Sequence, residues 1–142
     1  MDKLRFPGSL HNHTDFSNFR LRDSINTVEG LMDYALELEH QVVAITEHDT
    51  IASAIRAEKY YNKIKKDNPN FKLIRGNEIY LVRNGLNNQN YKKETDRYFH
   101  FILLAKDLEG HRQIREVSSR AWMRSYVARR LRRVPTYYQD LI

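Results

Sequence analysis

The run Val42-Val43-Ala44-Ile45-Thr46-Glu47-His48-Asp49 joins four apolar, mostly β-branched residues directly to a group of polar residues, several of which are metal-ligating types. Four consecutive apolar residues predict a strand that is buried on both faces, as the strands of parallel sheets are. The polar residues that follow such a strand lie at the carboxyl end of the sheet. In α/β folds, that end carries the functional groups.

Helix and strand patterns alternate on both sides of this run. Apolar stripes predict one helix from Asn26 or Thr27 to about Glu39 and another from Ile51 to about Lys66. We expect the remaining elements to be strands over 9–12, 71–74 (extended again over 79–82) and 98–105, an exposed loop over 84–97, and a helix over about 107–133 that Pro135 ends. This order favours an α/β fold with about four to five mainly parallel strands and flanking helices.

The length of 142 residues fits one domain, with 41% apolar and 30% charged residues. The chain has no cysteine, which excludes a disulfide framework and any thiolate metal site and leaves imidazole and carboxylate groups as ligands. We find no apolar run long enough to span a membrane and no signal-peptide pattern at the N-terminus. We therefore expect a cytoplasmic protein without a membrane partner.

The formal net charge of +6 is concentrated at one end of the chain. Residues 1–111 contain 16 basic and 16 acidic residues, whereas residues 112–142 contain eight arginines and two acidic residues. Such a segment attracts polyanions, so nucleic acid is a candidate partner. The candidate contacts are Arg120, Arg124, Arg129 and Arg130. The alternative is an ordinary solvated helix face that is rich in arginine.

Two histidine-containing segments follow predicted strands. His11 and His13 are two residues apart, so on an extended chain both imidazoles point to one face and can reach one ion. His48 stands between Glu47 and Asp49 at the end of the buried strand. The alternative for the first segment is that His11 and His13 are exposed histidines near the N-terminus. The alternative for the second is a helix N-cap at Asp49 or Thr50.

Three further side chains are candidates for the same site. Glu78 follows the strand over 71–74, and Gly76 would let the backbone bend so that the carboxylate faces the open end of the sheet. His100 stands in an otherwise apolar strand, and Asp23 lies in the loop after His13, close enough in sequence to fold back over the site. Taken alone, Glu78 could be an ordinary exposed residue and His100 a core histidine.

The order and placement of these motifs resemble the polymerase and histidinol phosphatase (PHP) domain family, in particular the version at the N-terminus of bacterial DNA polymerase III alpha subunits. The segments that carry the resemblance are Leu10–Ser17, Val43–Asp49, Gly76–Tyr80 and His100–Lys106, with Gly110 shortly after. The family fold is a distorted (β/α)7 barrel. The resemblance implies that residues 1–142 form a single, incomplete PHP-like domain, the N-terminal half of that barrel, with a motif-bearing core (1–111) and a basic helical segment (112–142).

The resemblance also implies a ligand set. It assigns His11, His13 and Glu78 to one divalent ion, Glu78 with His100 to a second, and His48 with Asp23 to a third. The metals would be Zn, Mn or Mg, up to three in the family and fewer here. The implied activity is phosphoester hydrolysis of the 3′-5′ proofreading type, on DNA or another phosphoester.

The chain departs from the family pattern in several places, among them Glu39, which stands where a helix-ending glycine is often found. Glu47 replaces a common aspartate, the loop between Ser17 and Asp23 is longer than in most polymerases, and the second half of the barrel with its late Asp-x-His is missing. The missing ligands would have to come from the remainder of a polymerase subunit or from a complementing chain. The alternative is a truncated or degenerate, non-catalytic module with a structural or nucleic-acid-contacting role.

Overall fold

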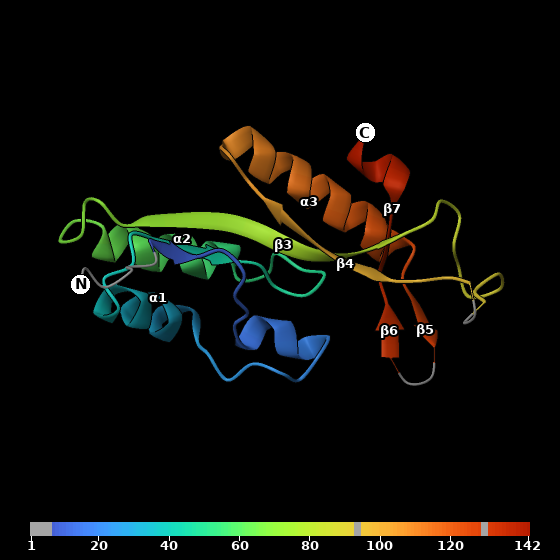
Figure 1. Cartoon of the computed structure of the whole chain (residues 1–142), viewed down its shortest axis with the longest axis horizontal. Coiled ribbons are helices and arrows are strands. Elements are labelled where there is room, and N and C mark those ends of the chain that lie inside the picture. Colours follow the sequence, from blue (N-terminus) through green and yellow to red (C-terminus); the bar gives the residue numbers. More distant parts are fainter. Residues whose placement is uncertain (1–6, 93–94, 129–130) are drawn as a thin grey trace, which may run out of the picture.

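A central sheet of five strands runs through the molecule in the computed structural model, which describes residues 7–92, 95–128 and 131–142 (Figure 1). Its strands are β1 (Gly8–Ser9), β2 (Val42–Ile45), β3 (Lys72–Val82), β4 (Phe99–Leu104) and β7 (Pro135–Tyr137). The helices are α1 (Val28–Glu37), α2 (Ala54–Ile64) and α3 (Leu108–Met123), with short 3₁₀ helices η1 (Asp15–Phe19) and η2 (Tyr138–Leu141). A separate hairpin consists of β5 (Tyr126–Ala128) and β6 (Leu131–Arg133).

The sheet is mainly parallel, as predicted, and has one antiparallel member. β1, β2 and β3 are parallel neighbours, and β7 is parallel to β3. β4 runs antiparallel to β3. The segment between β3 and β4 contains no described helix, and a parallel return would need a crossover of that kind.

β3 is one long strand, which corrects the prediction that Glu78 follows the end of a strand. Its first residues pair with β2, residues Gly76 to Leu81 pair with β4, and its last three residues also pair with β7. The role predicted for Gly76 also changes, because the backbone does not bend there. A Cβ atom at this position would lie 2.6 Å from the carbonyl oxygen of Leu103 and 2.8 Å from Cγ2 of Thr46, so glycine lets the neighbouring strands approach.

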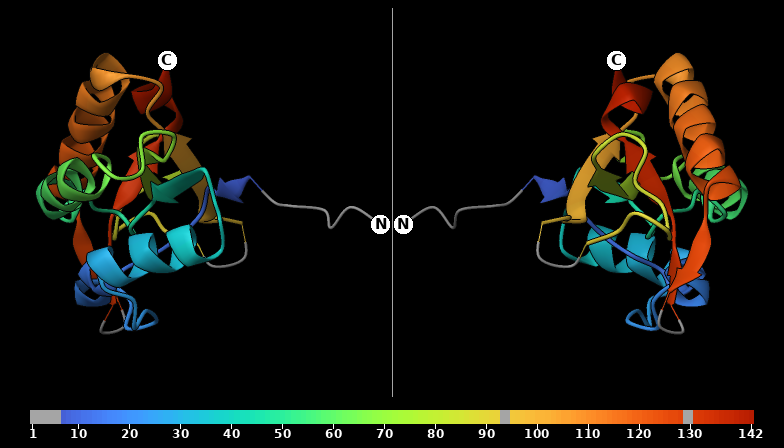
Figure 2. Two further views of the ribbon diagram at one scale, coloured as in Figure 1. Left: turned by 90° about the vertical axis from the view of Figure 1, so that its left-hand side faces the viewer. Right: turned by 90° about the vertical axis from the view of Figure 1, so that its right-hand side faces the viewer.

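The helices α1 and α2 pack on one face of the sheet (Figure 2). α1 and α2 follow the predicted positions closely, and α1 begins where the Thr27 hydroxyl accepts a hydrogen bond from the Gly30 N–H. The core between these helices and β2 contains Val28, Met32, Ala35, Val43, Ile45, Ala57 and Phe71. Side chains alternate along a strand, so the opposite face of β3 carries Gly76, Glu78 and Tyr80.

The C-terminal part differs from the predicted helix over 107–133. α3 ends at Met123, and the chain then forms the β5–β6 hairpin and returns through β7 beside β3. Tyr126 and Val127 favour extended structure, and the Tyr126 hydroxyl contacts the Tyr98 hydroxyl, a tertiary contact that a longer helix would lose. Pro135 begins β7 rather than ending a helix. None of the described helices is long and apolar enough to cross a membrane.

Candidate metal centre

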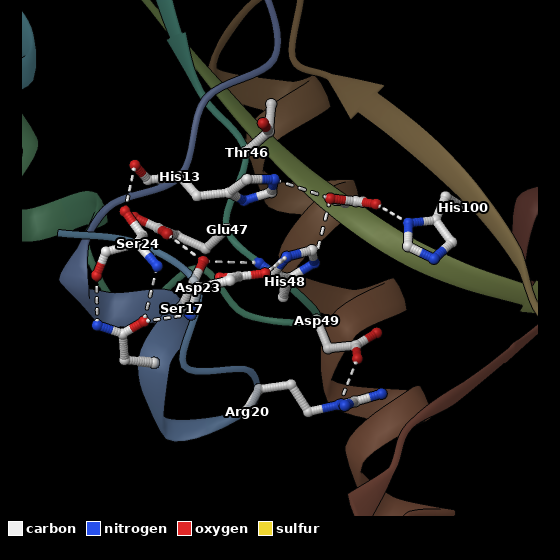
Figure 3. Close-up of polar contacts among 12 residues, drawn as sticks. His13, Ser17, Arg20, Asp23, Ser24, Thr46, Glu47, His48, Asp49 and His100 are labelled. Atoms are coloured by element: carbon white, nitrogen blue, oxygen red, sulfur yellow. Dashed lines mark hydrogen bonds and ion pairs between the residues drawn. The ribbon is translucent and has the colours of Figure 1, made fainter. Parts of the chain in front are cut away.

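One buried carboxylate, that of Glu78, is the centre of a cluster of histidines. Its Oε2 lies 3.1 Å from Nε2 of His11, 3.0 Å from Nε2 of His13 and 3.1 Å from Nδ1 of His48. Its Oε1 contacts Nδ1 of His100. The side chain of Glu78 is 1% exposed, whereas those of His11 and His100 are more than half exposed. The cluster is therefore anchored in the sheet and open to solvent on one side. Figure 3 shows three of its histidines, His13, His48 and His100.

Backbone pairing brings these residues together from distant parts of the sequence. The segment after β1 lies beside the end of β2, because Thr46 donates its N–H to the Asn12 carbonyl oxygen and Asn12 donates its N–H to the Thr46 hydroxyl. A parallel bridge then pairs His48 with Glu78. His100 stands near the start of β4 rather than at the exit of a strand. Since β4 is antiparallel, its beginning lies beside the later part of β3.

The long loop after His13 carries Asp23 back to the cluster, as predicted. Oδ2 of Asp23 lies 3.0 Å from Nε2 of His48. The side-chain oxygen of Asn18 accepts hydrogen bonds from the N–H groups of Asp23 and Ser24, and the Ser24 hydroxyl donates to the His13 carbonyl oxygen (Figure 3). The loop is thus tied to the backbone of the histidine pair. All six predicted side chains therefore lie in one cluster.

The donor set fits a divalent cation. Nε2 of His11, Nε2 of His13 and Oε2 of Glu78 are 3.0–3.1 Å from one another. Two ligands about 2.05 Å from a tetrahedral Zn²⁺ lie about 3.3 Å apart, so these atoms are already close to a metal-binding arrangement. Neutral imidazole nitrogen and carboxylate oxygen are ligands that Zn²⁺ and Mn²⁺ accept. These three residues could therefore hold one ion with only a small expansion of the cluster.

The electrostatics of the cluster also favour a cation. Burial raises the pKa of Glu78, but hydrogen bonds from His13, His48 and His11 outweigh it and hold the pKa well below its usual range. Burial lowers the pKa of His48, but Glu78 and Asp23 outweigh it and leave the pKa raised. The site therefore keeps its carboxylate ionised and attracts positive charge.

Glu47 supports the site through hydrogen bonds to residues that flank the proposed ligands. Its fully buried carboxylate accepts hydrogen bonds from the Thr14 N–H, the Thr14 hydroxyl and the Ser17 hydroxyl. The Ser17 oxygen in turn accepts a hydrogen bond from the His48 N–H. Glu47 thus joins the segment after His13 to the end of β2. The sequence marked Glu47 as a neighbour of His48 and as a departure from the family pattern, but did not predict its contacts with Thr14 and Ser17.

Asp49 and Arg20 form a buried ion pair that sequence reasoning missed. Nε of Arg20 lies 3.0 Å from Oδ2 of Asp49. Burial raises the pKa of Asp49 to about 7, and the guanidinium of Arg20 opposes this shift. Asp49 also has a positive φ of 56°, and its carbonyl oxygen accepts a hydrogen bond of 2.6 Å from the indole N–H of Trp122 on α3. The only sign in the sequence is an arginine within an unusually long polar loop.

The alternative that Asp49 or Thr50 caps the second helix is wrong. α2 begins at Ala54 after Ser53, and no side chain caps it. The Thr50 hydroxyl accepts a hydrogen bond from the Ala52 N–H, in the turn that precedes the helix. The Asp49 side chain instead belongs to the ion pair with Arg20.

The structure separates the four arginines proposed for nucleic-acid contact. Arg120 is exposed on α3. Both terminal nitrogens of Arg124 are hydrogen-bonded to the Asp140 carboxylate, and its guanidinium lies over the ring of Tyr137, 4.2 Å from the centroid. Arg129 and Arg130 lie outside the described residues. Arg124 therefore has a structural partner inside the chain.

Comparisons with known proteins agree with this geometry. The family model described as PHP domain matches residues 9–142. A DNA-directed DNA polymerase of Bacillus phage SPbeta is 42% identical over 136 residues, which cover 92% of this chain and 10% of that protein. The DNA polymerase III subunit alpha of Helicobacter pylori (strain 26695) is 33% identical over 118 residues, 82% of this chain and 9% of that protein.

A solved structure shares the fold. The chain from Bifidobacterium adolescentis, described as a candidate metal-dependent phosphoesterase, superposes with a TM-score of 0.52 at 23% sequence identity. The match covers 80% of this chain and 32% of that chain. This chain also spans only about a tenth of the length of the polymerases that it matches.

Proposed function

This chain belongs to the PHP domain family, and on that premise we propose that it is the PHP unit of a DNA polymerase III alpha-like protein and takes part in metal-dependent phosphoester hydrolysis. The observation that carries the proposal is the convergence of four histidines on the buried carboxylate of Glu78. A cluster of this kind has an evident use in binding cations and no evident use in the stability of the fold.

The proposed ligands are the six residues of the cluster. His11, His13 and Glu78 would hold one ion, Glu78 and His100 a second, and His48 and Asp23 a third, with Zn, Mn or Mg as the metal. Such ions neutralise phosphate oxygens and lower the pKa of bound water toward neutrality. Glu78 keeps its charge in the buried site, the Glu47 carboxylate holds Ser17 against the His48 N–H, and the loop after Ser17 brings Asp23 to His48.

The proposed substrate is a phosphodiester of DNA, and the reaction is the removal of a nucleotide from a 3′ end, as in proofreading. The polymerase relatives support DNA as the substrate. A further polypeptide, either the rest of a polymerase subunit or a complementing chain, is the proposed partner. β4 has no strand partner on its outer side among the described residues, so the sheet can be extended there.

Hydrolysis of bis(4-nitrophenyl) phosphate and of a 3′-labelled oligonucleotide, each with Mn²⁺ or Zn²⁺, tests this function. His13→Ala removes a proposed ligand, and His40→Ala is the matched control, because His40 lies beyond α1, away from the cluster. We expect metal-dependent cleavage by the wild type and His40→Ala and its loss in His13→Ala.

Equal activity in all three proteins would assign the cleavage to a contaminant and contradict the proposal. No cleavage by any of them, even after addition of the remaining polymerase chain, would favour the alternative of a non-catalytic PHP module.

A further inference from the structure

A cluster of aromatic rings and one guanidinium lies next to the proposed metal centre. Tyr98 lies just before β4, two residues before His100, so the Cα atoms of the two residues are at most about 7 Å apart. The ring of His100 contacts the ring of Tyr80, 4.4 Å between centroids, on the face that carries Glu78. Tyr98 therefore lies close to one of the proposed metal ligands along the chain.

Three separate segments meet at Tyr98. The guanidinium of Arg133 on β6 lies over the ring of Tyr98, 5.1 Å from its centroid. The hydroxyl of Tyr126 on β5 contacts the Tyr98 hydroxyl, and the ring of Tyr91 lies 6.0 Å from that of Tyr98. These contacts fix the β5–β6 hairpin against the start of β4, beyond which it projects from the sheet (Figure 1). We call Tyr91, Tyr98, Tyr126 and Arg133 the tyrosine–arginine cluster.

The cluster carries a positive charge that no described carboxylate neutralises. Arg133 makes no ion pair with any residue in the described ranges, and Asp96, two residues before Tyr98, is already paired with Arg83. Tyr91 is 40% exposed, and Tyr98, Tyr126 and Arg133 are partly exposed. A ligand that suits this surface needs both an anionic group and flat aromatic faces.

Single-stranded nucleic acid has both features. Proteins bind single-stranded nucleic acid with basic side chains placed along its phosphate backbone and with aromatic side chains on which its bases stack. A duplex fits less well, because its bases are stacked on one another and their faces are hidden. The cluster also lies beside His100, so a DNA strand bound to it would place the neighbouring nucleotide at the metal centre.

We propose that the tyrosine–arginine cluster is a binding site for single-stranded DNA that leads a strand into the metal centre. This inference rests on the proposed function for its biological purpose. The binding itself does not need a metal, so it can be measured separately from hydrolysis.

The hairpin offers a matched control for Arg133. In the register of β5 and β6, Tyr126 is opposite Arg133 and Val127 is opposite Arg132, so Arg132 and Arg133 point to opposite faces. Arg132 is exposed and donates a hydrogen bond to the Ser125 hydroxyl. Arg132→Ala therefore removes the same charge from the same strand without touching Tyr98.

Binding of a fluorescein-labelled 15-nucleotide thymidine oligonucleotide, in EDTA and over a range of salt concentrations, tests the site. Each phosphate contact with a single strand contributes about −0.7 to the slope of log K against log salt, or about fivefold in affinity between 1 M and 0.1 M salt. We expect Arg133→Ala to weaken binding at 0.1 M salt by about fivefold and to reduce the slope by about 0.7. Arg132→Ala should change affinity by less than about twofold.

Arg133→Lys guards against a folding defect in the alanine variant, because it keeps the charge and should therefore keep the salt slope of the wild type. Equal effects of Arg132→Ala and Arg133→Ala, no binding by the wild type, or tighter binding of a duplex of the same length would each overturn the site. Selective loss in Arg133→Ala without any metal-dependent hydrolysis would retain this site and reject the proposed function. Metal-dependent hydrolysis by the wild type without a selective loss of DNA binding in Arg133→Ala would retain the proposed function and reject this site.

Discussion

Nε of Arg20 lies 3.0 Å from Oδ2 of Asp49, and each of the two side chains is 1% exposed. The pair joins the long loop that carries Asp23 to the backbone that carries His48. Arg20 also lies over the ring of Tyr80, 5.0 Å from its centroid, and Trp122 on α3 binds the Asp49 carbonyl oxygen. A buried ion pair therefore supports the loop side of the metal centre.

Breaking this pair should destabilise the fold. We expect Arg20→Met to lower the free energy of unfolding by about 3 kcal/mol, near the low end for a broken buried pair, because Asp49 can bind a proton once the cation is gone. Urea denaturation measures the change. The double variant Arg20→Met/Asp49→Asn should lose less unfolding free energy than the sum of the two single variants. As a control, Arg56→Ala, at the exposed pair with Glu29, should cause no resolvable change. Strictly additive losses would show that the two residues act independently.

Glu78→Gln should remove most metal binding while the fold persists. The change conserves shape but removes the charge that four histidines surround. Changes to partners outside the ligand shell already weaken metal sites by 10–100-fold, so we expect at least about a tenfold loss in Mn²⁺ or Zn²⁺ affinity by titration calorimetry. Glu37→Gln, at an exposed position on α1, is the control. Equal metal content in the two variants would contradict a role for Glu78.

Gly76→Ala should destabilise the fold, whereas Gly110→Ala should not. A Cβ at Gly76 meets the Leu103 carbonyl oxygen and Thr46 Cγ2 within 3 Å, and we expect a loss of about 1–3 kcal/mol together with weaker metal binding, since Glu78 lies two residues further on. A Cβ at Gly110 meets nothing closer than 3.5 Å, and Gly110 lies in the first turn of α3. Alanine there should be neutral or stabilise the fold by up to about 1 kcal/mol. Thermal denaturation compares the two, and a stable Gly76→Ala protein would disprove the close approach.

Asp140 should make the stability of the C-terminal part depend on pH. Burial raises the pKa of Asp140, but the Arg124 guanidinium and the Tyr137 N–H outweigh it, so the pKa is lowered. A lowered pKa contributes stability that is present above the unfolded value of about 3.9 and is lost as pH falls through the folded value. Asp140→Asn should therefore flatten the decline in unfolding free energy below about pH 4. An unchanged acid profile in this variant would mean that other carboxylates govern the decline.

The spacing of apolar residues along the sequence correctly predicted the helices and strands whose formation depends mainly on that spacing. The stripe beginning at Val28 and the run Val42–Ile45 correspond to α1 and β2, because both elements pack on the same core. The apolar positions Ala128 and Leu131 continued the helical period of α3, yet they lie in the hairpin, where the contact of Tyr126 with Tyr98 and the pairing of β5 with β6 prevail. The periodicity of apolar residues gives no information about such long-range contacts.

The candidate site was more predictable than its supports. Its six side chains belong to short motifs whose residue types suit metal binding, and the sheet brings all of them together. The antiparallel direction of β4, the carboxylate of Glu47 behind the site and the Arg20–Asp49 pair depend on how distant segments meet. No spacing in the sequence encodes those encounters.

The placement of β7 beside β3 has a consequence for how the protein is made. The motif-bearing strands leave the ribosome early, but one edge of β3 near Tyr80 stays open until Pro135 has been synthesised and can pair with it. Closing a contact between such distant residues is entropically costly and slow. Nascent chains therefore pass through a stage in which β3 is only partly paired, and the synthesis of β7 determines when that vulnerable period ends.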